Sequence, residues 1–179
     1  MPDYIYCVSC MANSEAVVAR SLEERLDVRA VCLSYDREER KNGVWRVVTH
    51  PMLWGYVFLY ADEPVELSRI YQIDPVNLVL RYDDGDCNLR GGDRAFALRV
   101  LACDGRIGLS QALLVGGKTR IVGGPLKNYE GVIKSFDRHK RFAWVDVNIG
   151  NETKPIRMYF EWLTVQDGTM VRLRDSVIG

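Results

Sequence analysis

The sequence has only two histidines, five cysteines and no long hydrophobic run in its 179 residues, and its 24 basic side chains are balanced by 24 acidic ones. Without an apolar run of roughly 18–20 residues, no membrane-spanning helix is expected. The N-terminus lacks a basic region followed by an apolar stretch, so we predict no signal peptide, a cytoplasmic location and no membrane partner. A hydrophobic fraction of 47% at zero net charge argues against disorder and favours packed cores.

The five cysteines are too few and too scattered to form a disulfide scaffold in a chain of this length. Cys7 and Cys10 form a C-x-x-C pair, but no second pair of ligands accompanies them, so we predict no zinc site. A redox-active pair normally lies at a strand-to-helix turn, whereas this pair lies inside a predicted strand. Thiol-redox chemistry at Cys7 and Cys10 stays open as a second alternative function.

Catalytic motifs are missing as well. The sequence contains no G-x-S-x-G, P-loop or H-E-x-x-H pattern. His50 precedes a proline and His139 falls at a predicted hairpin tip, so neither suits a nucleophile–base pair. The acidic run at residues 83–86 lacks the glutamate that an EF-hand requires twelve positions along. We therefore predict that the chain is not an enzyme and uses no cofactor or metal ion.

Glycines and a change in charge divide the chain. Residues 1–117 carry 13 basic and 17 acidic side chains, whereas residues 118–179 carry 11 and 7. Residues 104–117 contain four glycines and show little periodicity, which is typical of a linker. We predict two domains, at residues 1–103 and 118–179, joined by this linker.

The first predicted domain mixes strands and helices. Aromatic and β-branched residues predict strands at 4–8, 28–33, 55–60 and 76–80. Apolar residues at helical spacing predict helices that begin near Ser14 and that span 64–72 and 92–103. A hairpin of 36–40 against 44–48 closes on Asn42-Gly43, the pair typical of a type I′ turn. The expected fold is an α/β sandwich with the sheet on one side and the helices on the other, and its strand 55–60 is apolar enough to be covered on both faces.

The second predicted domain consists of short strands separated by turn residues. The strands are expected at 119–122, 129–136, 141–149 and 154–160, which is typical of a small closed β-barrel. In the third of these, alternation places Ala143, Val145, Val147 and Ile149 on the buried face. Phe142 and Trp144 lie on the opposite face. The whole chain is therefore expected to be α+β.

Basic side chains are concentrated around the hairpin tip at residues 137–141. The candidate RNA-binding residues are Lys127, Lys134, Arg138, His139, Lys140 and Arg141. Phosphates favour such a cluster because binding releases their counterions, and the neighbouring rings of Phe142 and Trp144 could stack on bases. The alternative is that the tip is charged only because it is solvated, and the pattern alone leaves both interpretations open.

A tryptophan stands directly before the most apolar strand. Trp54 would lie at the rim of the first domain's sheet, and aromatic residues in that position are frequent interface anchors. The alternative is that Trp54 closes the hydrophobic core. The sequence does not separate these two interpretations.

Three stretches together resemble a known family. They are Tyr6-Cys7-Val8, Leu53-Trp54-Gly55-Tyr56-Val57, and the run from Gly123 to Ile133, GGPLKNYEGVI. On these residues the chain resembles the bacterial NusG-like transcription elongation factors, which join an NGN domain to a KOW domain. The last stretch is similar to the KOW signature, in which a Gly-Pro turn leads to Glu-Gly and an apolar strand. Trp54 stands where the family usually has proline.

Two further stretches concern subgroups of that family. Residues 137–141, DRHKR, resemble the specialised LoaP antiterminators, whose KOW domain is associated with RNA hairpins. Housekeeping members carry an aromatic loop that engages Rho or a ribosomal protein, whereas residues 147–151 here have Ile149 in the place of the aromatic residue. The resemblance therefore implies the specialised subgroup, and a housekeeping factor that binds Rho or a ribosomal protein is the alternative.

The resemblance implies both fold and function. It implies an NGN-like sandwich followed by an SH3-like KOW barrel, in a monomeric factor that promotes processive antitermination. The clamp region of RNA polymerase would bind the first domain through Tyr6, Leu53, Trp54 and Tyr56. Nascent RNA, as a hairpin, would bind the six basic candidates of the second domain. DNA near the transcription bubble would be contacted by the basic residues of the 36–48 hairpin, namely Arg37, Arg40, Lys41 and Arg46.

Overall fold

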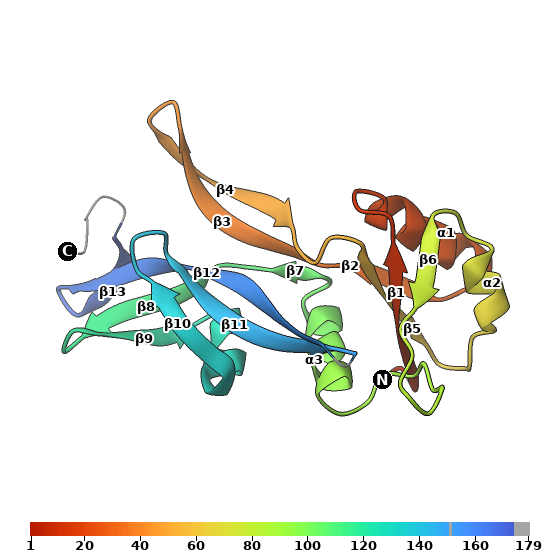
Figure 1. The fold of residues 1–179 in the computed structure, drawn as a ribbon. Helices are drawn as coiled ribbons and strands as arrows, with labels where there is room; N and C mark the ends of the chain where they lie inside the picture. Colours follow the sequence, from red (N-terminus) through yellow and green to blue (C-terminus); the bar gives the residue numbers. More distant parts are fainter. Residues whose placement is uncertain (151, 174–179) are drawn as a thin grey trace. The chain divides into compact units, whose positions relative to one another are not determined.

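The computed structural model describes residues 1–150 and 152–173, which form two compact units (Figure 1). Unit 1 combines Met1–Ser34, Pro51–Arg106 and Val147–Lys154, and unit 2 combines Tyr35–His50, Ile107–Asp146 and the described part of Pro155–Gly179. Each unit joins segments from both sides of the predicted domain boundaries, so those boundaries stay a prediction. The fold is α+β, as predicted, and its sheets include a curled half-barrel. Within the described residues, no helix is long and apolar enough to cross a membrane.

Unit 1 is built on a four-stranded antiparallel sheet in the order β2-β5-β1-β6. The strands are β1 (Tyr4–Cys10), β2 (Arg29–Cys32), β5 (Tyr56–Ala61) and β6 (Val76–Val79). All four predicted strands are confirmed to within two residues at either end. The two most apolar strands, β1 and β5, lie in the centre, where both of their faces are removed from water.

Helices cover both faces of this sheet. They are α1 (Glu15–Leu26), α2 (Leu67–Tyr71) and α3 (Gly91–Ala102). Figure 1 shows α1 and α2 on one face and α3 on the other. All three helices were predicted, but the prediction that they share one side of the sheet is wrong.

The side chains of β5 explain why two helical layers are needed. Leu59 belongs to the core cluster that also contains Leu22 of α1 and Ile70 of α2. Phe58 points to the opposite face, where the ring of Phe96 from α3 packs edge-on at 5.9 Å. Because neighbouring side chains in a strand alternate between faces, a continuous apolar run requires cover on both.

A three-stranded sheet in the order β4-β3-β7 contains the predicted hairpin. Its strands are β3 (Ser34–Lys41), β4 (Val44–Pro51) and β7 (Arg106–Ile107). The turn between β3 and β4 has positive φ at both Asn42 (52°) and Gly43 (78°), as a type I′ turn requires. The hairpin prediction is therefore confirmed.

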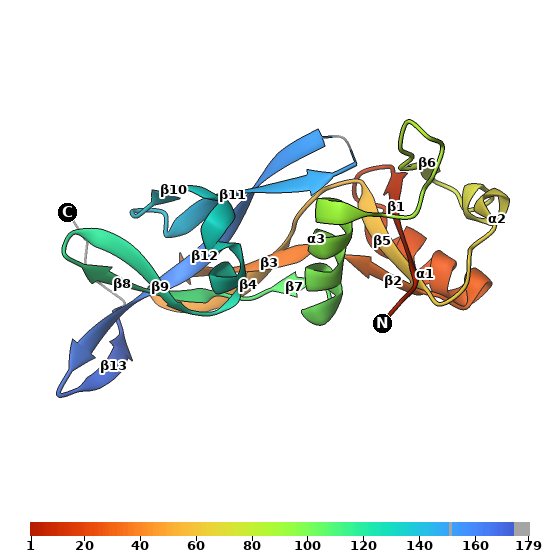
Figure 2. The ribbon, with the colours of Figure 1, turned by 90° about the horizontal axis from the view of Figure 1, so that it is seen from below.

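The remaining strands of unit 2 form one sheet in the order β10-β11-β12-β8-β9, and β13 pairs with β12. They are β8 (Ser110–Val115), β9 (Lys118–Gly123), β10 (Ile133–Asp137), β11 (Phe142–Ile149), β12 (Glu152–Gln166) and β13 (Thr169–Arg172). The end of β12 forms a hairpin with β13 (Figure 2). Between β9 and β10 the chain forms the 3₁₀ helix η1 (Pro125–Val132).

Two segments of the chain differ from the sequence predictions. Residues 104–117, predicted as a linker, contain β7 and β8, and β8 pairs in parallel with β12 through Ser110 and Phe160. Residues 129–132, predicted to begin a strand, belong to η1 instead. At residues 104–117 the glycines dominated the local pattern. At η1, Leu126 and Tyr129 are buried and hold the 3₁₀ helix against the sheet.

Candidate functional site

Trp54 occupies a rigid, exposed turn at the start of β5. Its side chain is 52% exposed, and the residues on either side, Leu53 and Gly55, have φ of 56° and 80°. The Gly55 amide donates a hydrogen bond to Oε1 of Glu15 (2.5 Å), and the Gly55 carbonyl accepts one from the amide of Cys10 (2.8 Å). A Cβ on Gly55 would lie 2.9 Å from the Cys10 carbonyl oxygen, so this close approach requires glycine. Trp54 is thus presented to solvent and does not close the core.

The other predicted polymerase-binding residues are placed differently. Leu53 and Tyr56 are half-buried beside Trp54. Tyr6, by contrast, is only 5% exposed, and its hydroxyl accepts a hydrogen bond from the Val65 amide. Its burial also raises the pKa of the Tyr6 hydroxyl. Tyr6 is therefore a core residue and does not form part of the exposed rim.

One rim residue was missed by sequence reasoning. Met11 follows directly after Cys10, whose amide bonds to Gly55, and its side chain is largely exposed. The signal in the sequence was a large apolar residue just beyond the end of a strand. We refer to Met11, Leu53, Trp54 and Tyr56 as the apolar rim.

The turn between β10 and β11 carries three of the predicted RNA-binding residues. Arg138, His139 and Lys140 are exposed there. The turn is closed by Asp137, whose carboxylate accepts a hydrogen bond from the Lys140 amide (2.8 Å), and by Arg141, which has φ of 57°. Asp137 thus acts mainly on the backbone of the turn, a common use of aspartate in such positions.

Arg138 ties this turn to the one between β8 and β9. Its guanidinium donates hydrogen bonds to the carbonyl of Gly117 (2.7 Å) and to the hydroxyl of Thr119 (3.2 Å). Lys118, which is exposed and lies between those two partners, therefore joins the cluster. Sequence reasoning missed Lys118 because it precedes Arg138 by twenty residues and lies just before a different predicted strand, 119–122. We refer to Lys118, Arg138, His139 and Lys140 as the basic turn surface.

The other three predicted RNA-binding residues have different surroundings. The amino group of Lys134 pairs with Asp146 at 3.2 Å, so its charge is partly compensated. Lys127 is exposed on η1. The Arg141 side chain is only 17% exposed, because its guanidinium pairs with Glu38 (3.2 Å) and lies 5.2 Å from the ring of Trp45. Arg141 is thus placed for packing within unit 2.

Glu38 is the centre of a buried charge network. Its side chain is 7% exposed and contacts both Arg141 and Arg172, each at 3.2 Å. Arg172 also pairs with Glu161, which is equally buried. The network connects β3, the β10–β11 turn, β12 and β13. Each buried carboxylate has a cation beside it, as desolvation of the charge requires.

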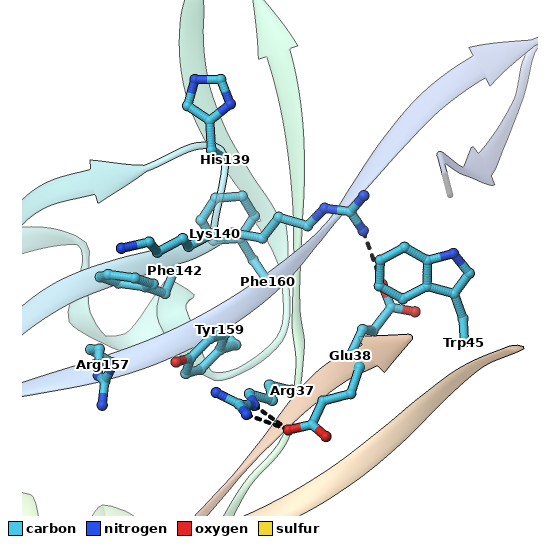
Figure 3. A pocket seen from close by; sticks show the side chains of 11 residues that line it. Arg37, Glu38, Trp45, His139, Lys140, Phe142, Arg157, Tyr159 and Phe160 are labelled. Atoms are coloured by element: carbon cyan, nitrogen blue, oxygen red, sulfur yellow. Dashed lines mark hydrogen bonds and ion pairs between the residues drawn. The ribbon is translucent and has the colours of Figure 1, made fainter. Parts of the chain in front are cut away.

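A cavity of about 370 Å³ lies beside this network (Figure 3). Its lining comes from the β3–β4 hairpin, the β10–β11 turn and β12. The aromatic lining residues include Trp45, Phe142 and Tyr159, and the basic ones include Arg37, Lys140 and Arg157. In Figure 3, Lys140, Phe142 and Arg157 lie on one side of the view and Trp45 on the other, whereas His139 points away from them.

The aromatic face predicted beside the basic tip is partly covered. Phe142 is 5% exposed because Trp144 packs edge-on against it (5.4 Å) and Tyr159 contacts it (5.6 Å). The guanidinium of Arg157 lies 5.8 Å from the Phe142 ring and 5.7 Å from the Trp144 ring. The buried face of β11 is as predicted, since Ala143 and the other alternate residues to Ile149 are buried. Residue 151, the last of the stretch compared with the housekeeping loop, lies outside the described residues.

The β3–β4 hairpin keeps most of its basic residues exposed. Arg40, Lys41 and Arg46 are exposed, and contact with DNA stays a prediction for them. Arg37 instead pairs with Glu39, which also contacts Nε2 of His50 at 2.7 Å. These two partners, Arg37 first, lower the pKa of the Glu39 carboxyl below its usual value.

The two cysteines of the C-x-x-C pair are buried in unit 1. Burial raises the pKa of both the Cys7 and the Cys10 thiol, so that thiolate, the reactive form, is scarce near neutral pH. In the acidic turn at 83–86, Asp84 pairs with Arg90 at 2.6 Å. Within residues 1–150 and 152–173, no group of three metal-ligating side chains is close enough to hold a metal ion.

In comparisons of the whole chain, no family model and no curated protein matches it. The functional assignment therefore depends on the two exposed surfaces and on the sequence motifs. One surface, the apolar rim, belongs to unit 1. The other, the basic turn surface, belongs to unit 2.

Proposed function

We propose that the chain is a specialised transcription elongation factor that promotes processive antitermination. In this proposal an NGN-like domain binds the clamp region of RNA polymerase, and a KOW-type domain binds nascent RNA, as a hairpin. The observation that supports it best is that unit 1 exposes the apolar rim around Trp54 and unit 2 exposes the cationic basic turn surface. A factor that links an enzyme to its transcript needs these two chemistries.

The apolar rim has the properties of a protein-binding surface. Trp54 is exposed on a turn whose backbone is fixed by Glu15 and Cys10, so little conformational entropy is lost when a partner covers it. Large aromatic residues on preorganised backbone are frequent anchors of protein interfaces. Met11, which follows the residue bonded to Gly55, adds an exposed and adaptable apolar side chain.

The basic turn surface has the properties of an RNA-binding surface. Lys118, His139 and Lys140 come from two adjacent turns and are exposed, and Arg138 holds the turns together. Folded RNA is recognised mainly by its shape and by the spacing of its phosphates, which suits cations on protruding turns. Release of counterions from these phosphates would provide much of the binding free energy.

In this proposal the factor shifts the population of polymerase conformations and makes or breaks no covalent bond. A factor that binds the closed clamp more tightly than the open clamp stabilises the elongating state of the polymerase. Binding to nascent RNA would raise the local concentration of the factor near the polymerase that made that RNA. Both effects require only binding, and neither unit has to supply a reactive group.

Binding to polymerase can be tested with one matched pair of variants. We expect Trp54→Ala to weaken co-purification of the full chain with RNA polymerase core enzyme. Trp144→Ala, the same change at an exposed tryptophan of unit 2, should leave it intact. Circular dichroism checks that both variants are folded. Equal binding by all three proteins would contradict the assignment of the apolar rim.

A further inference from the structure

The cavity of unit 2 is large enough for a small ligand. Its volume of about 370 Å³ lies within the range of about 300–1,000 Å³ that is typical of ligand pockets. All of its lining residues belong to unit 2. They come from three separate segments of the chain, so the cavity is a product of folding that the sequence did not indicate.

The charges around the cavity favour an anion. The two acidic lining residues already have partners, since Glu38 pairs with Arg141 and Arg172, and Glu39 pairs with Arg37 and His50. Lys140 and Arg157 also line the cavity, and neither makes an ion pair within residues 1–150 and 152–173. Two cations without carboxylate partners therefore remain beside the space, and both can bind a phosphate group.

The aromatic lining favours a flat ring. Tyr159 lines the cavity but is only 7% exposed, because Tyr35 stacks on it with the ring centroids 5.0 Å apart and Phe142 contacts it at 5.6 Å. Trp45 is half-buried on the other side of the view in Figure 3. Trp45, whose ring lies 5.2 Å from the Arg141 guanidinium, therefore offers the surface on which another planar ring could stack.

A ligand that combines a planar ring with an anionic group is a nucleotide. We propose that this cavity binds a single unpaired nucleotide of an RNA, with the base against Trp45 and the phosphate against Lys140 and Arg157. The assignment rests on the proposed RNA-binding function and adds to it a site for one base. The nucleotide must be unpaired, because bases within a duplex are stacked and cannot enter a pocket.

The position of Lys140 connects the cavity with the basic turn surface. Lys140 and His139 belong to both, although the ring of His139 points away from the other labelled side chains in Figure 3. An RNA whose stem phosphates contact Arg138 and His139 would thus have a loop or bulge nucleotide close to Lys140. Phosphate contacts alone carry no sequence information, so the cavity is where this protein would read a base.

The first test uses the full chain and mononucleotides in isothermal titration calorimetry. We expect at least one of AMP, CMP, GMP and UMP to bind more tightly than both its own nucleoside and inorganic phosphate. Arg157→Gln should weaken nucleotide binding about tenfold, because it removes a charge-assisted contact. Arg120→Gln, at an exposed arginine of β9 that does not line the cavity, should leave it unchanged. Equal binding of phosphate and nucleotides, or binding of none, would overturn the proposal.

The second test separates the cavity from the wider RNA-binding proposal. A pool of RNA hairpins with a fixed stem and a randomised loop is selected on the wild type, and a selected loop is then labelled with 2-aminopurine. Arg157→Gln and the conservative Trp45→Phe should change the fluorescence of one loop position. If hairpins bind with the expected salt dependence but no loop position responds, the cavity assignment is wrong and the RNA-binding function stands. If mononucleotides bind but no hairpin does, both the RNA-binding function and the assignment to an RNA nucleotide fail.

Discussion

The two units present their exposed surfaces by different means. In unit 1, Trp54 is held by the backbone, through left-handed φ values on both sides and the hydrogen bonds of Gly55 with Glu15 of α1 and Cys10 of β1. In unit 2, the basic turn surface depends on side chains, since Arg138 joins two turns and the Glu38 network lies beneath the same hairpin. The comparison shows that a rigid exposed group can be fixed either by local geometry or by long-range charge pairing. The two means should respond to different mutations.

The largest effect is expected from removing the centre of the charge network. Glu38→Ala would leave Arg141 and Arg172 without their shared buried carboxylate, and loss of one partner from a buried ion pair costs about 3–5 kcal/mol. We expect urea denaturation, followed by NMR signals of each unit, to show unit 2 unfolding at lower urea while unit 1 is unchanged. Glu38→Gln, which keeps the shape, serves as a control and should be less harmful. An equal loss of urea stability in both units would show that the Glu38 network does not act on unit 2 alone.

An intermediate effect is expected from the backbone of unit 1. Gly55→Ala combines a positive φ with a Cβ 2.9 Å from the Cys10 carbonyl oxygen, and such local strain costs about 1–3 kcal/mol. Gly43→Ala is the matched control, because its φ of 78° is similar but no atom lies within 4 Å of the added Cβ. We therefore expect Gly55→Ala to lower the melting temperature more than Gly43→Ala and to reduce binding to polymerase as well. The same loss in both variants would mean that the close approach to Cys10 contributes nothing.

A smaller effect is expected from the exposed cations of unit 2. Arg138→Gln with Lys140→Gln should reduce affinity for an RNA hairpin about tenfold and lower the salt slope of binding by about two. The control pair is Arg120→Gln with Arg20→Gln, two exposed arginines outside the basic turn surface, and it removes the same charge. Fluorescence anisotropy at several salt concentrations measures both quantities. If the control pair loses as much affinity, RNA binding depends on net charge and not on the clustered turns.

Sequence reasoning succeeded where a property is local. The apolar run of β5, the Asn42-Gly43 turn and the alternation in β11 each predicted the observed structure. It failed where partners are distant in the chain. Nothing near Arg141 reveals that Glu38, about a hundred residues earlier, removes it from the surface. The parallel pairing of β8 with β12 was hidden for the same reason, since glycines on both sides of β8 outweighed its short apolar segment.

The wrong placement of Tyr6 and the omission of Lys118 have a related cause, because the surroundings of each residue depend on the fold and not on its own segment. Tyr6 was placed on the exposed rim through the resemblance, yet alternation along β1 sends its ring into the core cluster of unit 1. Lys118 was overlooked because its neighbours in sequence are uncharged, and it joins the basic turn surface only through the bonds of Arg138. A candidate site read from one segment therefore identifies the turn but not its full set of residues.

The smallest expected effect concerns pH and again separates the units. Arg37 and then His50 lower the pKa of Glu39 in the folded state below the usual value of 4.5, so this carboxylate stabilises unit 2 fully above pH 4.5. That contribution is lost as the pH falls through the folded-state pKa, because protonation then removes the pairing. Urea midpoints between pH 6 and pH 3 should fall more steeply for the wild type than for Glu39→Gln, and only in signals from unit 2. Parallel curves for the two proteins would show that the Arg37–Glu39 pair, unlike the buried Glu38 network, is too exposed to stabilise the hairpin.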